Sequence, residues 1–159
     1  MLLEIEEDGN YELFRNGKIS ASFKVENDEI IGAHKTYYPD GQLKELITFT
    51  HNSVMHGLNE TYYPNGQIQF RVHYDMDNSV GEHTQWFENG AVDFVANHDK
   101  EGRLHGKSLK YYENGNLAEE RNYHKDKLHG EFTFYRENGD FWKRRTYRHG
   151  NLIETERKP

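Results

Sequence analysis

The chain has 159 residues, of which 34% are hydrophobic and 14% aromatic, so it offers little aliphatic material for a round core and favours a thin sheet covered by rings. Cysteine is absent, which excludes disulfides, thiolate metal sites and a cysteine nucleophile. The net charge of −7 argues against a general affinity for nucleic-acid phosphates or anionic lipid.

The amino terminus predicts a leader strand. Residues Met1–Asp8 have neither a basic start nor a long apolar core, so they do not form a signal peptide. No apolar run approaches the ~20 residues that a membrane-spanning helix needs. We therefore expect a cytoplasmic protein in which residues 1–10, centred on Leu2–Glu7, form a leader strand ahead of the rest.

An aromatic motif ending in glycine then recurs six times. Its glycines are spaced 24, 25, 24, 25 and 24 residues apart: Gly17, Gly41, Gly66, Gly90, Gly115 and Gly139. A second series of glycines lies nine residues before each of the last five glycines of the first series: Gly32, Gly57, Gly81, Gly106 and Gly130. Two interlocked series with one period indicate a tandem repeat of about six units.

Each unit predicts a β-hairpin. Asn-Gly and Asp-Gly pairs are strong hairpin signals, because the turn needs a positive φ that glycine adopts without strain. Proline in Pro39-Asp40-Gly41 and Pro64-Asn65-Gly66 suits the first corner of a type I turn, which favours a three-residue loop. The second glycines mark the return turns. Two strands per unit, a leader strand and a terminal strand near Leu152-Ile153 give about 12 strands and an all-β fold.

Loop length decides which side chains share a face. With a three-residue loop, Tyr62 lies on the face of Ile68, and that face continues through Phe70, Val72 and Tyr74. We expect this face to be packed, with a ladder of first rings: Leu13, Tyr37, Tyr62, Trp86, Tyr111 and Tyr135. The second residues of each pair then point to the opposite face: Phe14, Tyr38, Tyr63, Phe87, Tyr112 and Arg136, the last breaking the ring series. A two-residue turn would swap these assignments relative to the second strand.

Charge is distributed unevenly. Residues 1–75 carry 12 acids and 6 bases, whereas residues 141–159 carry six bases and two acids. The basic end is either a docking patch for an acidic partner or a charged terminal strand or tail (residues 151–159) that discourages edge-to-edge pairing.

The repeat resembles a known family. The segments Gly57–Ile68 and Gly106–Leu117, with the closing Leu104-His105-Gly106 and Leu128-His129-Gly130, are similar to the MORN repeat and especially to its longer bacterial variant. The resemblance covers roughly residues 8–150, and departures occur at Asp8 and Arg136. It implies that residues 1–159 form one array of 24–25-residue hairpin units in one long twisted antiparallel meander sheet. It also implies an antitoxin or immunity-type role, because stand-alone bacterial proteins of this kind are commonly grouped so.

The sequence contains no recognisable catalytic motif. His105 and His129 lie one unit apart, about 10 Å at the usual strand spacing, which is too far to share a zinc ion without bending. No serine lies in a nucleophile elbow, and no glycine-rich phosphate loop precedes a helix. We expect no metal, no cofactor and no enzymatic activity.

The leading hypothesis is a protein-binding module that occludes a cognate protein, such as a basic toxin. Its anchors would be the second-position side chains, since large rigid rings dominate interfaces: Tyr38, Tyr63, Phe87, Tyr112 and Arg136. Rings at strand spacing could equally serve only to hold the array together. Alternatives are a self-associating scaffold and, less favoured because of the net charge, a lipid-headgroup binder using the bases near the carboxyl end.

Overall fold

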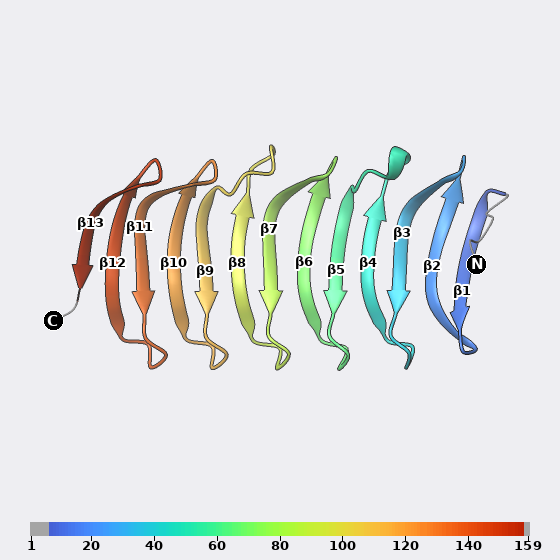
Figure 1. The fold of residues 1–159 in the computed structure, drawn as a ribbon, viewed down its shortest axis with the longest axis horizontal. Coiled ribbons are helices and arrows are strands. Elements are labelled where there is room, and N and C mark those ends of the chain that lie inside the picture. The colour runs from blue at the N-terminus through green and yellow to red at the C-terminus, as the bar shows by residue number, and fades with distance from the viewer. Residues whose placement is uncertain (1–6, 158–159) are drawn as a thin grey trace. The chain divides into compact units, whose positions relative to one another are not determined.

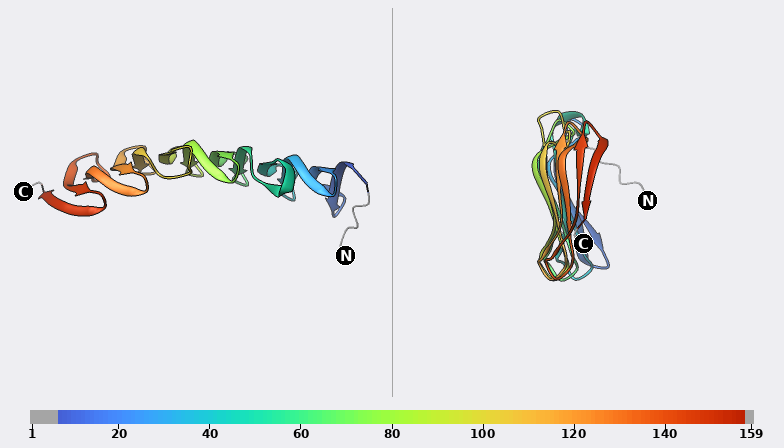
Figure 2. Two further views of the ribbon diagram at one scale, coloured as in Figure 1. Left: turned by 90° about the horizontal axis from the view of Figure 1, so that it is seen from above. Right: turned by 90° about the vertical axis from the view of Figure 1, so that its left-hand side faces the viewer.

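The computed structural model describes residues 7–157, and these residues form an all-β protein. The chain divides into two compact units, Met1–Asn78 (unit 1) and Ser79–Pro159 (unit 2). Most of the predicted leader strand lies outside the described residues. Each unit is a single layer of strands with no helical layer on either side (Figures 1 and 2).

Unit 1 is an antiparallel meander of hairpins. Within its described residues, each strand pairs with the next one along the chain. Its strands are β1 (Gly9–Arg15), β2 (Lys18–Glu26), β3 (Glu29–Tyr37), β4 (Leu43–Phe49), β5 (Gly57–Tyr62) and β6 (Ile68–Asp75), with a short 3-10 turn, η1 (His51–Ser53), after β4.

Unit 2 repeats this plan, again with each strand paired to its neighbour in the chain. Its strands are β7 (Asn78–Trp86), β8 (Val92–His98), β9 (Gly106–Tyr111), β10 (Leu117–His124), β11 (Lys127–Tyr135), β12 (Phe141–Arg148) and β13 (Asn151–Arg157). The predicted all-β antiparallel meander is confirmed. Thirteen strands lie within the described residues, including the predicted terminal strand.

One end of the hairpins, which we call the loop end, carries three-residue loops. Tyr38 donates its backbone N–H to the carbonyl of Gln42 at 2.8 Å, so residues 39–41 form the loop, as predicted. Asp40 accepts the N–H of Gln42 at 2.9 Å, which explains why Asp or Asn precedes the glycine. The same closing bonds occur in four further loops, from Tyr63 to Gln67, Phe87 to Ala91, Tyr112 to Asn116 and Arg136 to Asp140.

The first hairpin departs from this rule. Arg15 pairs directly with Lys18, so its loop has only two residues, Asn16 (φ 52°) and Gly17 (φ 75°). Positive φ at both positions is the type I′ geometry that suits a tight hairpin. Each of the six motif glycines has positive φ: Gly17, Gly41, Gly66, Gly90, Gly115 and Gly139.

The opposite end, the return end, alternates between two kinds of turn as far as Lys125-Asp126, after which a second short turn, His149-Gly150, follows. Short turns have two residues of positive φ, as in Asn27-Asp28, Met76-Asp77 and Lys125-Asp126. Long turns lie between them, closed by Thr50 N–H to Val54 O at 2.8 Å and by Asp99 N–H to Arg103 O at 2.9 Å. Because each 25-residue glycine interval contains a long turn and each 24-residue interval a short one, the extra residue of the spacing lies in the return turn.

The predicted packed face needs a correction. Tyr62 pairs with Ile68 as expected, but a register shift follows at once, and Thr61 pairs with Phe70. The bulge beside the three-residue loop therefore places Phe70 and Val72 on the face of Thr61 and Asn59, opposite Tyr62. Each first ring therefore shares a face with only one residue of the second strand, the one next to the loop. The same register shift recurs in four other hairpins, beside Tyr37, Trp86, Tyr111 and Tyr135.

The apolar core is thin in both units. Val25 and Val72 are 2% and 1% exposed in unit 1, and Ala96 is 0% exposed in unit 2. Several buried side chains are polar: Asn59, Glu60, Thr84, Ser108 and Thr133. Because so little aliphatic surface is buried, hydrogen bonds between neighbouring hairpins contribute much of the stability of each unit.

Candidate functional site

The second rings tie one hairpin to the next. In unit 1 the Tyr38 hydroxyl donates to the carbonyl of Tyr62 at 2.7 Å. In unit 2 the Tyr112 hydroxyl donates to the carbonyl of Tyr135 at 2.9 Å. Both rings are half-buried, so each presents part of its surface while its hydroxyl is fixed. A ring held in this way loses little conformational entropy when a partner covers it.

The other second-position residues differ in exposure. Tyr63 and Phe87 are half-buried, Phe14 is 61% exposed, and Arg136 is exposed. Phe14 and Phe87 have no hydroxyl with which to reach the next hairpin. The predicted anchors are therefore placed at the loop end of their own unit, Tyr38 and Tyr63 in unit 1 and Phe87, Tyr112 and Arg136 in unit 2.

A hollow of about 600 Å³ lies at the loop end of unit 1. Tyr37, Tyr38 and Pro39 provide apolar lining, and its charged lining consists of three cations and one carboxylate: Arg15, Lys18, Lys44 and Glu45. The hollow adjoins the one loop that has only two residues, next to the exposed Phe14. A tyrosine at position 14 could have tied the first loop to the second hairpin, as Tyr38 does further along.

A buried carboxylate supports the first ring of the third motif. Glu60 is 6% exposed, accepts the Tyr62 hydroxyl at 2.6 Å and accepts Nε of Arg71 at 2.6 Å. Burial and the bond to Glu60 raise the pKa of Tyr62 to about 12. Sequence reasoning missed this group, because a glutamate in an acidic half resembles a solvated side chain.

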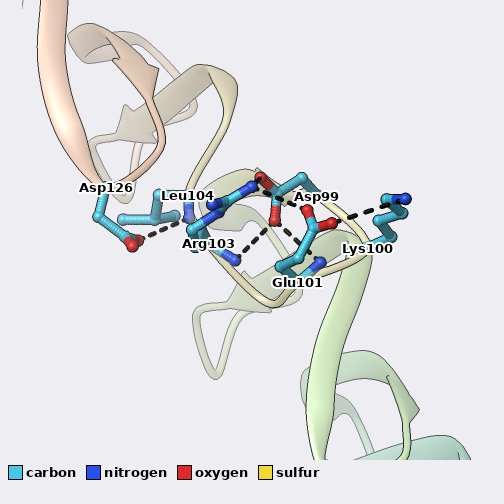
Figure 3. A network of polar contacts seen from close by, with 6 residues as sticks. All are labelled: Asp99, Lys100, Glu101, Arg103, Leu104 and Asp126. Atoms are coloured by element: carbon cyan, nitrogen blue, oxygen red, sulfur yellow. Dashed lines mark hydrogen bonds and ion pairs between the residues drawn. The ribbon is translucent and has the colours of Figure 1, made fainter.

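The long return turn of unit 2 is held by a polar network (Figure 3). Asp99 accepts the backbone N–H groups of Glu101 and Arg103 at 3.1 and 3.0 Å, and the Nε of Arg103 at 2.9 Å. These bonds lower the pKa of Asp99 to about 2, with the Arg103 side chain as the main cause. Asp126, from the next short turn, accepts the N–H of Leu104 at 2.8 Å. The network is structural and locks neighbouring return turns together.

Histidines form a row along the return end of unit 2. His124 lies between the two histidines predicted to be far apart, with ring centroids 5.1 Å from His105 and 5.9 Å from His129, and His149 follows 5.0 Å beyond His129. Desolvation and then the neighbouring positive charges lower the pKa of His124. Within residues 7–157, no three His, Asp or Glu side chains are grouped closely enough to hold one metal ion.

The family of the MORN repeat variant matches residues 31–51, 55–76 and 104–125, and each match is one hairpin with a three-residue loop. These three segments are therefore similar to the MORN repeat variant, and repeats of that kind are in general non-catalytic binding or scaffold modules. A comparison with curated proteins finds no match. In the described part of the chain, no helix is long and apolar enough to cross a bilayer.

Proposed function

We propose that this protein is an inhibitory, immunity-type binding module that occludes a cognate protein. The observation that supports this most is the set of half-buried loop-end rings, two of them fixed by hydroxyl bonds to the next hairpin. Rigid aromatic side chains provide large contact area at low entropic cost and are enriched among the residues that dominate interfaces.

The charge of unit 1 indicates the kind of partner. Residues 1–75 carry twice as many acids as bases, 12 against 6, and a basic cognate protein would be attracted to them. Such attraction increases association rates and weakens as salt screens it. A basic toxin, for example a nuclease, has this chemistry.

The test is capture from source-cell lysate with tagged protein, followed by titration of the captured partner. The variant Tyr63→Ala/Phe87→Ala removes one anchor from each unit, and Phe14→Ala removes the exposed ring of the first hairpin as a matched control. We expect the double variant to lose at least about tenfold in affinity with an unchanged circular dichroism spectrum. A folded double variant with unchanged affinity would falsify the anchor assignment.

A second candidate, self-association, is favoured by the terminal strand. All seven residues of β13 are exposed, and Leu152 and Ile153 are 54% and 55% exposed. An exposed apolar edge strand is a template for pairing with another chain. Sedimentation over a wide concentration range decides this: a monomer throughout contradicts it, and Ile153→Lys should abolish any dimer.

A further inference from the structure

One side of the strands β10 to β13 collects cations and rings. The register makes Arg121 the cross-strand partner of Phe132, and Phe132 the partner of Arg145. In the next row Phe134 pairs with Lys143, and Lys143 with Arg157. We call this surface the cationic side and define it by its positive residues: Arg121, Lys143, Arg145 and Arg157.

Aromatic rings hold these cations in place. The guanidinium carbon of Arg121 lies 4.9 Å from the Phe132 ring centroid, and that of Arg145 lies 5.6 Å from the Phe134 centroid. The Lys143 ammonium lies 4.2 Å from the centroids of both Phe134 and Trp142. Cation–π contacts of this kind fix the position of a charge without neutralising it.

The positive side chains on the two sides of these strands differ in whether they pair with carboxylates. On the opposite side, Lys107 pairs with Glu120 at 2.6 Å, and Arg144 pairs with Glu131 at 3.2 Å. On the cationic side, the ion pair within residues 7–157 joins Arg121 to Glu119, while Lys143 and Arg145 contact rings and no carboxylate. An overall acidic chain thus displays an uncompensated positive surface.

We propose that the cationic side binds an acidic, extended polypeptide segment. Lys143 and Arg145 lie two residues apart on one strand, about 6.6–6.8 Å along it, which is the spacing of alternate side chains in an extended peptide. Carboxylates at alternate positions of a bound segment would meet these cations in register. This proposal is independent of the loop-end anchors and of a basic partner for unit 1.

The neighbouring edge strand completes the site. In the described residues β13 pairs only with β12, so its outer edge has free backbone groups, to which a flanking part of the segment, beyond the part that lies over Lys143 and Arg145, can add as a strand. Thr155 and Arg157 pair with Arg145 and Lys143, so they share the cationic side. The exposed Leu152 near the start of β13 provides a contact for one apolar residue of the segment.

Nucleic acid fits this surface less well than a peptide. Single strands bind through bases that stack on open aromatic faces, and here Phe132 and Phe134 are covered by the protein's own cations. A long polyanion would also experience the net charge of −7.

The experiment uses two matched double variants of the full chain. Lys143→Gln/Arg145→Gln removes two charges from the cationic side, and Arg144→Gln/Arg148→Gln removes two charges from the same strand on its other side. Fluorescence anisotropy follows a labelled peptide in which glutamate alternates with threonine, long enough to run along β13. A second peptide has the same composition with its glutamates in one block, and an oligothymidylate of equal charge is the third probe.

We expect the alternating peptide to bind the wild type, and Lys143→Gln/Arg145→Gln to weaken it about tenfold while Arg144→Gln/Arg148→Gln changes affinity less than about twofold. Circular dichroism at each titration temperature verifies that both variants are folded. Equal loss in both variants, equal binding of the block peptide, or tighter binding of the oligothymidylate overturns the proposal. Because none of these substitutions touches Tyr63 or Phe87, failure here leaves the loop-end proposal untouched.

Discussion

The two ends of the hairpins follow different rules. At the loop end, five consecutive hairpins close with the same three-residue loop and the same pair of backbone bonds. At the return end, short two-residue turns alternate with longer ones over the first five turns, and the sixth, His149-Gly150, is short again. The loop end therefore has a period of one hairpin, whereas the first five turns of the return end have a period of two.

The alternation couples neighbouring turns. Asp77, in a short turn, accepts the N–H of Met55 at 2.8 Å, and its own N–H donates to the Met55 carbonyl at 2.9 Å. Asp126 makes the same two bonds to Leu104, at 2.8 and 2.9 Å. In both cases the short turn clamps the residue that follows the long turn before it. This difference indicates that the return end sets the repeating unit, and that the loop end only closes it.

The largest effect should come from a return-end glycine. Gly57 has φ +109°, and an added Cβ would lie 3.2 Å from Cγ2 of Thr48. Thr48 cannot yield easily, because its hydroxyl donates to Leu58 O at 2.7 Å. We expect Gly57→Ala to lower the free energy of unfolding by about 2–4 kcal/mol in urea denaturation.

The loop-end control for that variant is Gly115→Ala. Gly115 has φ +85° and no atom near an added Cβ, so only backbone strain remains, about 1–2 kcal/mol. Equal losses for the two alanines would mean that the return end is not the more constrained one.

The second-largest loss of stability should come from removing the clamp between Asp126 and Leu104. Asp126→Ala removes the acceptor of the Leu104 N–H, and we expect a loss of about 1–2 kcal/mol. Lys125→Ala, at the adjacent exposed position of the same turn, should change stability by less than about 0.5 kcal/mol. Hydrogen exchange at Leu104 gives a direct measurement, since its amide should exchange faster in Asp126→Ala alone. An unchanged exchange rate would show that the clamp does not hold the long turn.

Substitutions at the loop-end rings can either remove or add a hydroxyl hydrogen bond, and so lower or raise the free energy of unfolding. Tyr112→Phe deletes the bond to Tyr135 O and should cost about 0.5–1.5 kcal/mol. Phe87→Tyr adds a hydroxyl at the equivalent position of the preceding motif, where the carbonyl of Tyr111 is the corresponding acceptor. We expect a gain of about 0.5–1 kcal/mol in thermal or urea denaturation. A loss in Phe87→Tyr would show that the tie does not transfer between hairpins.

The smallest effect should be a pH dependence of unit 2. Burial, and then His98, lower the pKa of His83, and the His124 pKa is lowered too. The folded state then binds fewer protons than the unfolded state, so stability is full above the ordinary histidine pKa of about 6.5 and falls as the pH drops below it. A melting temperature that falls less between about pH 7.5 and pH 5.5 in His83→Gln/His124→Gln than in the wild type would confirm this. Parallel curves would contradict it.

Much of the fold is predictable from two glycine series and their turn residues. Pro39-Asp40-Gly41 predicts the three-residue loop, and the structure confirms it. The face assignment failed at Phe70 and Val72, because a bulge beside the loop inverts the alternation and has no distinct sequence signal. The alternating 24- and 25-residue spacing was visible in the sequence, yet its origin in the return turns became clear only from the turn geometry.

The candidate surfaces were less predictable. The aromatic pairs in the sequence predicted the rings at the loop end. They did not predict that the hydroxyls of Tyr38 and Tyr112 donate hydrogen bonds to the neighbouring hairpins. The basic run near the carboxyl end gave a net charge without showing that Arg144 is neutralised and Arg145 is not. Whether each arginine is paired with a carboxylate depends on which side of the strand its side chain faces, and the bulges determine that side.

The two-hairpin period has a consequence for how such a chain can grow or be cut. Met55 and Asp77 recur as Leu104 and Asp126, 49 residues later in each case. Duplication or deletion of a 49-residue block would preserve both of these clamps, whereas a block of one hairpin would bring two turns of the same kind next to each other, as happens in this chain only at its last two return turns, Lys125-Asp126 and His149-Gly150. Within the alternating part, residues 17–126, longer or shorter arrays should therefore be engineered in steps of two hairpins.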